Sequence, residues 1–368
     1  MKKVLYLFSS YKDSGPLTLA LNIAKNLPKD EFHPIFLSIS NDVNNSSIDY
    51  IRASGIETLE LNINRLLFPI IGRSEFINIV KKIGPNIIHS HLLRADYLNS
   101  VIKFDNVSRV STLHNQPYLD YSYTYGRCIG YLSALIHIKL INNITTLVAC
   151  SNYIKSFIYK KTMRQISTIK VGVRTDIFSP VTYEEKRNLR SKLKIELNSI
   201  VFIVLGNIIP RKNVSTIINA FESAQLPRNT ILVIAGDGED RVELESKIQS
   251  KNIKFVGRVA DVKQYLVASD FYISASLAEG LPAAVLEAMS CGLPVILSDI
   301  PSHKEIFENV DYNLFFNPLN TNELKKIIEN INYADVNFLS QLVKDIIHNK
   351  FCYLDMAKKY TNLYRSIS

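Results

Sequence analysis

Short runs of β-forming residues alternate with longer helical stretches along the whole of this 368-residue chain. Such alternation is typical of parallel sheets whose strands are connected by helices. In the first half we expect strands at Val4–Ser9, Pro34–Ile39, Glu57–Leu61, Asn86–Ser90, Arg109–Leu113, Thr145–Ala149 and Ser167–Val171. In the second half we expect strands at Ile200–Leu205, Thr230–Ala235, Ile253–Val256, Phe271–Ala275, Pro294–Ser298 and Asn313–Phe316.

Two such sets predict an α/β protein with two Rossmann-like domains, each a doubly wound parallel sheet. We place the first domain at residues 1–178 and the second at residues 179–350, with the boundary before the charged helix Glu184–Lys194. Amphipathic helices such as Leu17–Leu27 and Val214–Ala224 connect the strands. The tail, residues 351–368, forms a further amphipathic helix.

Cysteine usage and hydropathy indicate a cytoplasmic protein. The four cysteines are widely spaced and form no C-x-x-C pair, so neither a disulfide framework nor a zinc site is expected. No apolar run reaches the roughly 18 residues of a membrane span. Val4–Ser9 is better explained as a strand than as part of a signal peptide, because the apolar run is short and no small-residue cleavage site follows.

The positive charge lies in the first half of the chain. Residues 1–178 carry 21 Lys and Arg against 12 Asp and Glu, whereas residues 179–368 carry 22 of each kind. No acid stands between Asp120 and Asp176, where eight cations mix with tyrosines and the apolar run Cys128–Ile138. This mixture suits docking on an anionic membrane surface. A solvated basic face remains an alternative, and nucleic acid is disfavoured because no recognition helix, zinc ligand set or RNP-like motif is present.

Unusual residues follow the predicted strands, where open parallel sheets bind their ligands. Gly15, His91 and His114 follow strands of the first half. Those of the second half are followed by Gly206-Asn207, Gly236-Asp237-Gly238, Gly257-Arg258 and Glu279-Gly280. If the two domains face each other by these edges, all these residues line one interdomain cleft.

Leu277–Ile306 is the most informative segment. Glu279 and Glu287 lie eight positions apart around Gly280, Leu281, Pro282 and Ala283, between two strands. Pro282 suits the first position of a helix and Gly292 suits its end. A helix N-terminus favours an anion such as phosphate, because its backbone N–H groups and dipole are positive. The alternatives are structural: Glu287 would lie on the surface of the helix, and Glu279 would only complement the dipole of the helix N-terminus.

Arg211 and Lys212 stand in the loop before another helix, Val214–Ala224. Adjacent cations at a helix N-terminus conflict with its dipole unless an anion lies opposite. A diphosphate would resolve the conflict, because Arg binds phosphate oxygens bidentately and Lys acts as a point charge.

The histidines and glycines narrow the chemistry further. His114 ends a buried strand, and both a structural and a functional role remain open for it. His89 and His91 share a strand face, but no third ligand at metal spacing is evident, so we expect no metal site. Neither Ser14-Gly15-Pro16 nor Gly236-Asp237-Gly238 forms a dinucleotide fingerprint, which argues against an NAD enzyme.

Together these residues resemble glycosyltransferase family 4, retaining enzymes of the two-Rossmann-domain GT-B fold. The Glu279-x7-Glu287 pair, with EGLP before it and EAMSCGLPVI after it, is similar to the family signature. Ser14-Gly15, His114, Gly172-Val173 and Pro210-Arg211-Lys212 match family positions in order, as do IAGDGE, FVGRV and ASDFYISAS. The tail resembles the closing helix that crosses back to the first domain.

The resemblance implies that the second domain binds a nucleotide-sugar and the first binds the acceptor. Glu287 would hold the ribose, and Arg211 and Lys212 the diphosphate, aided by backbone N–H groups of Gly280–Ala283 and Gly15. Glu279 would lie near the donor sugar, His114 near the donor or reacting centre, and Arg258-Val259 beside the base. Asn207, where the family often has Arg, would belong to the same donor site.

We therefore expect retaining, metal-independent transfer of a hexosyl or N-acetylhexosaminyl group from a nucleoside-diphosphate sugar, UDP-linked, without a cofactor. The charge asymmetry suggests a lipid-linked saccharide acceptor at the inner face of a bacterial plasma membrane, as in O-antigen or other surface polysaccharide synthesis. The alternatives are a nucleotide-sugar epimerase of the same fold and a non-catalytic nucleotide-binding module on the membrane.

Overall fold

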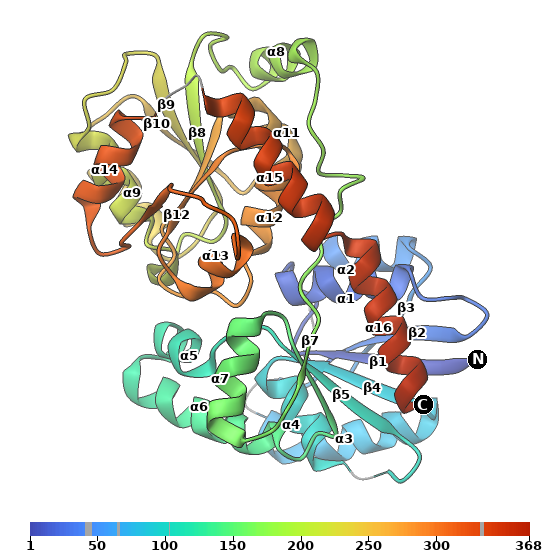
Figure 1. Ribbon diagram of the computed structural model, residues 1–368. Helices are drawn as coiled ribbons and strands as arrows, with labels where there is room; N and C mark the ends of the chain where they lie inside the picture. The colour runs from blue at the N-terminus through green and yellow to red at the C-terminus, as the bar shows by residue number, and fades with distance from the viewer. Residues whose placement is uncertain (41–45, 65–66, 103, 332–334) are drawn as a thin grey trace. The chain divides into compact units, whose positions relative to one another are not determined.

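The computed structural model describes residues 1–40, 46–64, 67–102, 104–331 and 335–368. It divides the chain into two compact units, each built on its own parallel sheet (Figure 1). Unit 1 comprises Met1–Gly172 together with Tyr353–Ser368, and unit 2 comprises Val173–Cys352. The sequence had placed the boundaries after residues 178 and 350. The predicted cleft between the domains stays a prediction, and each unit is described by itself.

Both sheets are parallel throughout, and their strand orders are β3-β2-β1-β4-β5-β6-β7 in unit 1 and β10-β9-β8-β11-β12-β13 in unit 2. The strands of unit 1 are β1 (Lys2–Phe8), β2 (Phe32–Ser38), β3 (Glu57–Glu60), β4 (Ile87–His91), β5 (Ser108–Leu113), β6 (Thr146–Ala149) and β7 (Ser167–Thr168). Those of unit 2 are β8 (Ile200–Leu205), β9 (Thr230–Ala235), β10 (Ile253–Gly257), β11 (Phe271–Ser274), β12 (Val295–Ser298) and β13 (Phe315–Phe316). Every predicted strand has an observed counterpart, and the ends differ most at β7, which ends at Thr168 rather than Val171.

Helices connect consecutive strands. Those of unit 1 are α1 (Gly15–Lys25), α2 (Ser46–Ala53), α3 (Phe68–Ile83), α4 (Leu93–Val101), α5 (Pro117–Tyr125), α6 (Arg127–Ile141), α7 (Asn152–Thr162) and α16 (Tyr353–Ile367). Those of unit 2 are α8 (Tyr183–Lys192), the 3-10 helix η1 (Pro210–Lys212), α9 (Val214–Ser223), α10 (Arg241–Lys247), α11 (Val262–Ala268), α12 (Ala283–Ser290), α13 (Pro301–Ile306), α14 (Thr321–Glu329) and α15 (Val336–Lys350). No helix of the described residues is long and apolar enough to cross a membrane.

Alternation along β1 shows why the sheet of unit 1 is covered on both faces. Val4, Tyr6 and Phe8 belong to one hydrophobic cluster, which includes side chains of α1, α2 and α16. Leu5 and Leu7 belong to a second cluster, which includes side chains of α3 and α4. Successive strand residues point to opposite faces, so a strand that is apolar at every position requires helices on both sides.

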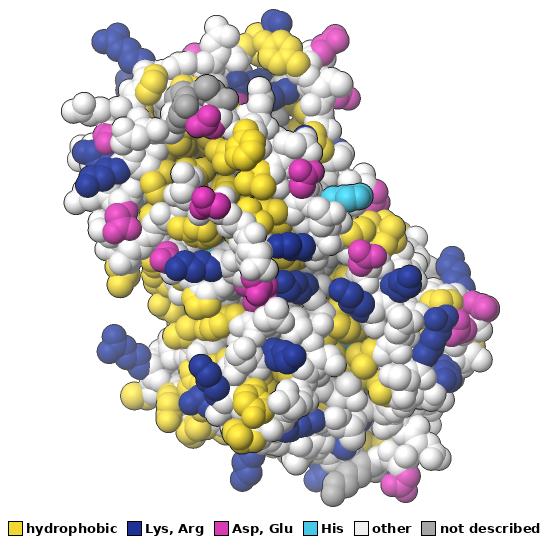
Figure 2. Space-filling model, in the orientation of Figure 1, with side chains coloured by type: hydrophobic (Ala, Val, Ile, Leu, Met, Phe, Trp, Pro, Cys, Tyr) yellow, Lys and Arg dark blue, Asp and Glu magenta, His cyan; other side chains and the backbone are white. Residues whose placement is uncertain are grey.

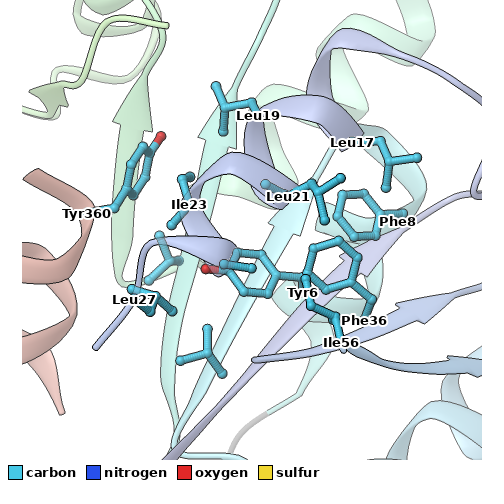
Figure 3. Close-up of a cluster of buried hydrophobic side chains, with 14 of the residues drawn as sticks. Tyr6, Phe8, Leu17, Leu19, Leu21, Ile23, Leu27, Phe36, Ile56 and Tyr360 are labelled. Atoms are coloured by element: carbon cyan, nitrogen blue, oxygen red, sulfur yellow. The ribbon is translucent and has the colours of Figure 1, made fainter. Parts of the chain in front are cut away.

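Helix α16, the last helix of the chain, packs into unit 1 and completes its core. Tyr360 and Tyr364 of this helix are fully buried, and Met356 is 2% exposed. Figure 3 shows Tyr360 beside the cluster that Tyr6, Phe36 and the side chains of α1 form. The buried hydroxyls find partners, as buried polar groups must: Tyr364 donates to the hydroxyl of Tyr6 at 3.1 Å, and the Tyr360 hydroxyl lies 2.9 Å from Oγ1 of Thr112.

Candidate active site

The strand order of unit 2 reverses between β8 and β11, which lie side by side although six elements, from η1 to α11, separate them in sequence. Strand β8 pairs with β9 on one side and with β11 on the other. Loops that leave the carboxyl ends of two such strands diverge, and the crevice between them is the usual ligand site of open α/β sheets. The loop after β8 carries Arg211 and Lys212, and the loop after β11 carries Glu279.

Backbone contacts hold these two loops against each other. The N–H of Leu277 donates to the carbonyl of Arg211 at 2.8 Å, and Arg211 returns a side-chain hydrogen bond to the carbonyl of Ala278 at 2.6 Å. The chain turns into α9 at Asn213, which has left-handed backbone angles and donates from its side chain to the carbonyl of Pro318. Asn is one of the few residues other than Gly that adopts this conformation readily.

Glu279 pairs with both cations at once. Its Oε1 lies 2.6 Å from Nζ of Lys212 and its Oε2 lies 2.9 Å from a guanidinium nitrogen of Arg211. The side chain of Glu279 is 10% exposed, that of Lys212 21% and that of Arg211 18%, so the ion pairs are largely shielded from water. The structure thus brings three of the predicted site residues, Arg211, Lys212 and Glu279, into one cluster.

The charges of the cluster determine its protonation. Burial would raise the pKa of Glu279, but Lys212 and Arg211 together with a hydrogen bond from Ser276 outweigh it, so this pKa lies well below its usual range. The nearby hydroxyl of Tyr272 responds in the opposite direction, because burial and the negative charges of Glu279 and Glu287 all raise its pKa. The cluster thus carries one carboxylate and two cations near neutral pH, an excess of one positive charge.

Helix α12 begins beside Glu279 with unpaired backbone donors. The N–H groups of Gly280, Leu281, Ala283 and Ala284 donate to no residue that the structure describes. The first turn of any helix leaves such donors, and an anion is a natural partner for them. Pro282 is the N-cap, with extended backbone angles, so its prediction as the first helical residue was wrong by one position.

The end of α12 is as the sequence predicts. Gly292 has a φ of +81°, a left-handed conformation that favours glycine, and follows the C-cap Cys291. The N–H of Gly292 donates to the carbonyl of Met289 and that of Leu293 donates to the carbonyl of Ala288, which satisfies the last turn of the helix.

Two glycines after β9 allow the neighbouring loops to approach closely. A Cβ on Gly236 would lie 1.8 Å from the carbonyl oxygen of Gly206, and one on Gly238 would lie 2.2 Å from that of Ile208. Between them the N–H of Ile208 donates to the carbonyl of Asp237 at 2.9 Å. The IAGDGE motif therefore packs the loop after β9 directly beneath the loop that leads to the two cations.

The remaining predicted residues of unit 2 lie around this cluster. Asn207 is exposed and lines a small pocket with Lys212, Gly206 and Ser276 at the ends of β8 and β11. Glu287 lies on the second turn of α12 and is half-buried. Arg258 is exposed and Val259 is half-buried, directly after β10. No group of three or more His, Cys, Asp or Glu in the described ranges has the arrangement of a metal site.

Gly15 and His114 belong to unit 1, so their predicted contribution to the same site stays a prediction. Gly15 is exposed and is the first residue of α1, after the N-cap Ser14. His114 follows β5 and is half-buried; burial lowers its pKa to about 4, so the ring is neutral near pH 7. Its Nε2 lies 2.8 Å from Nδ1 of His91.

Residues 185–335, the greater part of unit 2, match the family model described as "Glycosyl transferases group 1". Over this range the chain is similar to the group 1 glycosyl transferases. The enzyme class predicted from the sequence is thereby confirmed at the level of glycosyl transfer.

Curated glycosyltransferases match this chain over nearly its whole length. The O-antigen biosynthesis glycosyltransferase WclY of Escherichia coli is 25% identical over 99% of this chain and 98% of its own. The UDP-Gal:alpha-D-GlcNAc-diphosphoundecaprenol alpha-1,3-galactosyltransferase of E. coli is 26% identical over 95% of this chain and 93% of its own. Among solved structures, Anabaena Alr3699/HepE in complex with UDP and glucose is similar with a TM-score of 0.84 at 18% identity, over all of both chains. The fold predicted from the sequence, two Rossmann-like domains of the GT-B type, is confirmed.

Sequence reasoning missed two residues that contact predicted site residues, one in each unit. Ser276, which hydrogen-bonds Glu279, is one of several serines at strand ends and has no distinguishing spacing. His91 was predicted to follow a strand of the first half and to share a strand face with His89. The spacing that placed the two on one face gave no sign that His91 contacts His114 from the next strand.

Proposed function

We propose that this glycosyltransferase moves a hexosyl or N-acetylhexosaminyl group from a UDP-sugar to a lipid-linked saccharide, with retention at the anomeric carbon and without a metal. The product would enter a bacterial surface polysaccharide such as an O-antigen. The observation that carries the proposal is the cluster of Arg211, Lys212 and Glu279 beside the unpaired amides of α12. The activities named for the two E. coli relatives support the substrate classes.

The cluster and the helix N-terminus supply what a diphosphate leaving group requires. Cleavage of the donor leaves negative charge on the diphosphate, and fixed donors aimed at that charge are the main catalytic lever. Arg211 and Lys212 would contact the phosphates. Their oxygens would accept hydrogen bonds from the N–H groups of Gly280, Leu281, Ala283 and Ala284. Glu279 holds both cations in place before the donor binds and would lie near the sugar afterwards.

The rest of the donor would be bound around this cluster. Glu287, one turn further along α12, would accept hydrogen bonds from the ribose diol, and Arg258-Val259 would flank the base. Asn207, which shares a pocket with Lys212, would contact the same donor. In unit 1, Gly15 would add a backbone amide and the neutral His114 would contact the donor sugar.

Lys212→Ala tests the proposal directly. Loss of one electrostatic contact to the leaving group typically costs ~2.7–4 kcal/mol, so turnover should fall by about 100- to 1000-fold. Lys247→Ala is the matched control, because Lys247 also pairs with a glutamate but both side chains are about two-thirds exposed on α10. Release of UDP and of glycosylated lipid is measured for a panel of UDP-hexoses and UDP-N-acetylhexosamines, with and without EDTA. Near-normal turnover of Lys212→Ala, or dependence on a divalent metal, would overturn this account.

We further propose that unit 1 docks on an anionic membrane at the cytoplasmic face through α6. The buried residues of this helix are Gly130, Ala134, His137, Ile138 and Ile141, and its other side exposes large apolar residues by 42–64%. The exposed side chains are Ile129, Tyr131, Leu132, Leu135 and Ile136. Figure 2 shows hydrophobic and basic side chains next to each other over α6 and α7.

Charge complementarity favours a membrane of anionic lipid as the occupant. The exposed cations Arg127, Lys139, Lys160 and Lys161 lie on α6 and α7, and each adds about 1 kcal/mol near such a surface. The double variant Leu132→Glu, Ile136→Glu should lose most flotation with vesicles of anionic lipid, while Val242→Glu, at a site 80% exposed in unit 2, should not. Equal flotation with neutral and anionic vesicles, or no effect of the double variant, would refute this docking mode.

A further inference from the structure

Three histidines gather at the carboxyl ends of β4 and β5 in unit 1. His89 and His91 lie on β4, and His114 follows β5. The ring centroids of His89 and His91 are 4.4 Å apart, and those of His91 and His114 are 5.1 Å apart. His89 is fully buried and His91 is 1% exposed. Only His114 has a place in the proposed transfer reaction, which leaves the two buried rings without an assigned role.

His89 is fully satisfied by its neighbours. Its Nδ1 lies 2.6 Å from the hydroxyl of Tyr364 and its Nε2 lies 2.7 Å from Oγ1 of Thr112. It therefore ties α16 to β5 and needs no ligand. His91 differs, because its Nδ1 contacts Nε2 of His114 at 2.8 Å whereas its own Nε2 is buried and has no hydrogen-bond partner among the described residues.

Nδ1 of His91 has a hydrogen-bond partner and Nε2 has none, and this difference determines which of the two nitrogens carries the proton. Burial lowers the pKa of His91 well below its usual range and that of His114 to about 4, so both rings are neutral near pH 7 and each carries one N–H. A proton on Nε2 of His91 would be a buried donor without an acceptor, which native structures avoid more strictly than an unused lone pair. The proton therefore lies on Nδ1 of His91 and is donated to Nε2 of His114.

The assignment has a consequence for His114. With Nε2 accepting a hydrogen bond, the single proton of the neutral ring lies on Nδ1, which forms no hydrogen bond with a described residue. The ring of His91 is itself held in place, because it stacks on Phe8 at 5.2 Å with an interplanar angle of 5°. Because the Nδ1–H group of His91 is held in place and donates to Nε2 of His114, the Nδ1–H group of His114 also has a fixed direction.

We propose that His91 is a positioning residue that fixes His114 as the Nδ1–H tautomer, so that His114 donates a hydrogen bond to an oxygen of the donor sugar. The proposal rests on the transfer reaction proposed above, in which His114 contacts the donor sugar. It adds that His114 acts through a hydrogen bond of fixed direction rather than through charge, and it names the residue that sets this direction.

The test combines a spectroscopic and a kinetic measurement on the full chain. Long-range ¹H–¹⁵N correlation spectra of protein labelled at the histidine rings report which nitrogen is protonated, and His114→Gln identifies the signals of His114. We expect protonated Nδ1 and unprotonated Nε2 on His114 at pH 7.5. His91→Leu should raise the Nε2–H form and lower kcat by about 10-fold, the effect of one misdirected neutral hydrogen bond. His91→Asn places an amide donor where Nδ1 stood and should keep kcat within about 3-fold.

His348→Leu, at an exposed position of α15, is the control and should change neither measurement. A protonated Nε2 on His114 of the unaltered protein would overturn the inference, as would a His91→Leu protein with unchanged tautomer and kcat. If His91→Leu does not fold, the spectrum of the unaltered protein and the kinetics of His91→Asn decide. Absence of transfer from every UDP-sugar would refute the proposed function instead, because the tautomer can still be read from the spectrum.

Discussion

Replacing Glu279 by Gln should change stability and anion affinity in opposite directions. The substitution keeps the shape of the side chain but removes the carboxylate charge that lies 2.6 Å from Lys212 and 2.9 Å from Arg211. Breaking a buried ion pair by neutralising one partner typically costs ~3–5 kcal/mol. The two cations are about one-fifth exposed and keep some hydration, so we expect a loss of about 2–4 kcal/mol in the free energy of unfolding.

An anion that binds where the carboxylate stood should recover the lost free energy of unfolding. In the unaltered protein a diphosphate competes with Glu279 for Lys212 and Arg211, whereas in Glu279→Gln both cations are free of that competition. A gain of about 1–2 kcal/mol would tighten pyrophosphate or UDP binding by about 5- to 30-fold. Turnover should nevertheless fall, because Glu279 is proposed to lie near the donor sugar.

The measurement is urea unfolding with and without inorganic pyrophosphate, together with calorimetric titration of UDP. Glu243→Gln is the matched control, since Glu243 also pairs with a lysine but on the exposed surface of α10, and neither quantity should change. A Glu279→Gln protein as stable as the unaltered one would refute the electrostatic reasoning. Weaker rather than tighter pyrophosphate binding would show that these cations do not face the anion.

Three further predictions concern the packing and pH response of the two units. Gly236→Ala would bring a Cβ within 1.8 Å of the Gly206 carbonyl, so unit 2 should lose more than about 2 kcal/mol of stability in urea unfolding; an unchanged midpoint would contradict the close approach. Tyr364→Phe removes the hydrogen-bond partner of Nδ1 of His89 and should destabilise unit 1 by about 1–3 kcal/mol in urea unfolding. A change of less than about 0.5 kcal/mol would argue against this hydrogen bond. Burial lowers the pKa of His89 to about 3 and of His303 to about 4, below the value of about 6.5 in the unfolded chain, so the unfolded state binds more protons below pH 6.5. Stability should therefore be full above pH 6.5 or so and fall as the pH drops toward 4, by about 2 kcal/mol per histidine at pH 5, whereas a flat profile from pH 8 to 5 would refute the assigned burial.

Local sequence was sufficient for the secondary structure and for much of the fold. The strands were predictable because short runs such as Ile200–Leu205 and Ile231–Ala235 are apolar at every position, as in strands that are covered on both faces. The end of α12 was predictable because Gly292 takes a left-handed conformation that other residues avoid. These signals depend on residues that are close together in the chain.

The contacts between residues far apart in the chain could not be predicted in this way. Lys212 and Glu279 are 67 positions apart, and they meet because β8 pairs with β11 rather than with a strand nearer in sequence. Tyr364 reaches His89 across 275 positions, and His91 meets His114 because β4 lies beside β5. Sequence by itself thus determined which elements form and which side chains lie at strand ends, since propensity and periodicity act over a few residues. Only the tertiary structure decided which charges pair and which imidazole nitrogen is left without a partner, because both depend on the order of strands in the sheet and on what burial excludes.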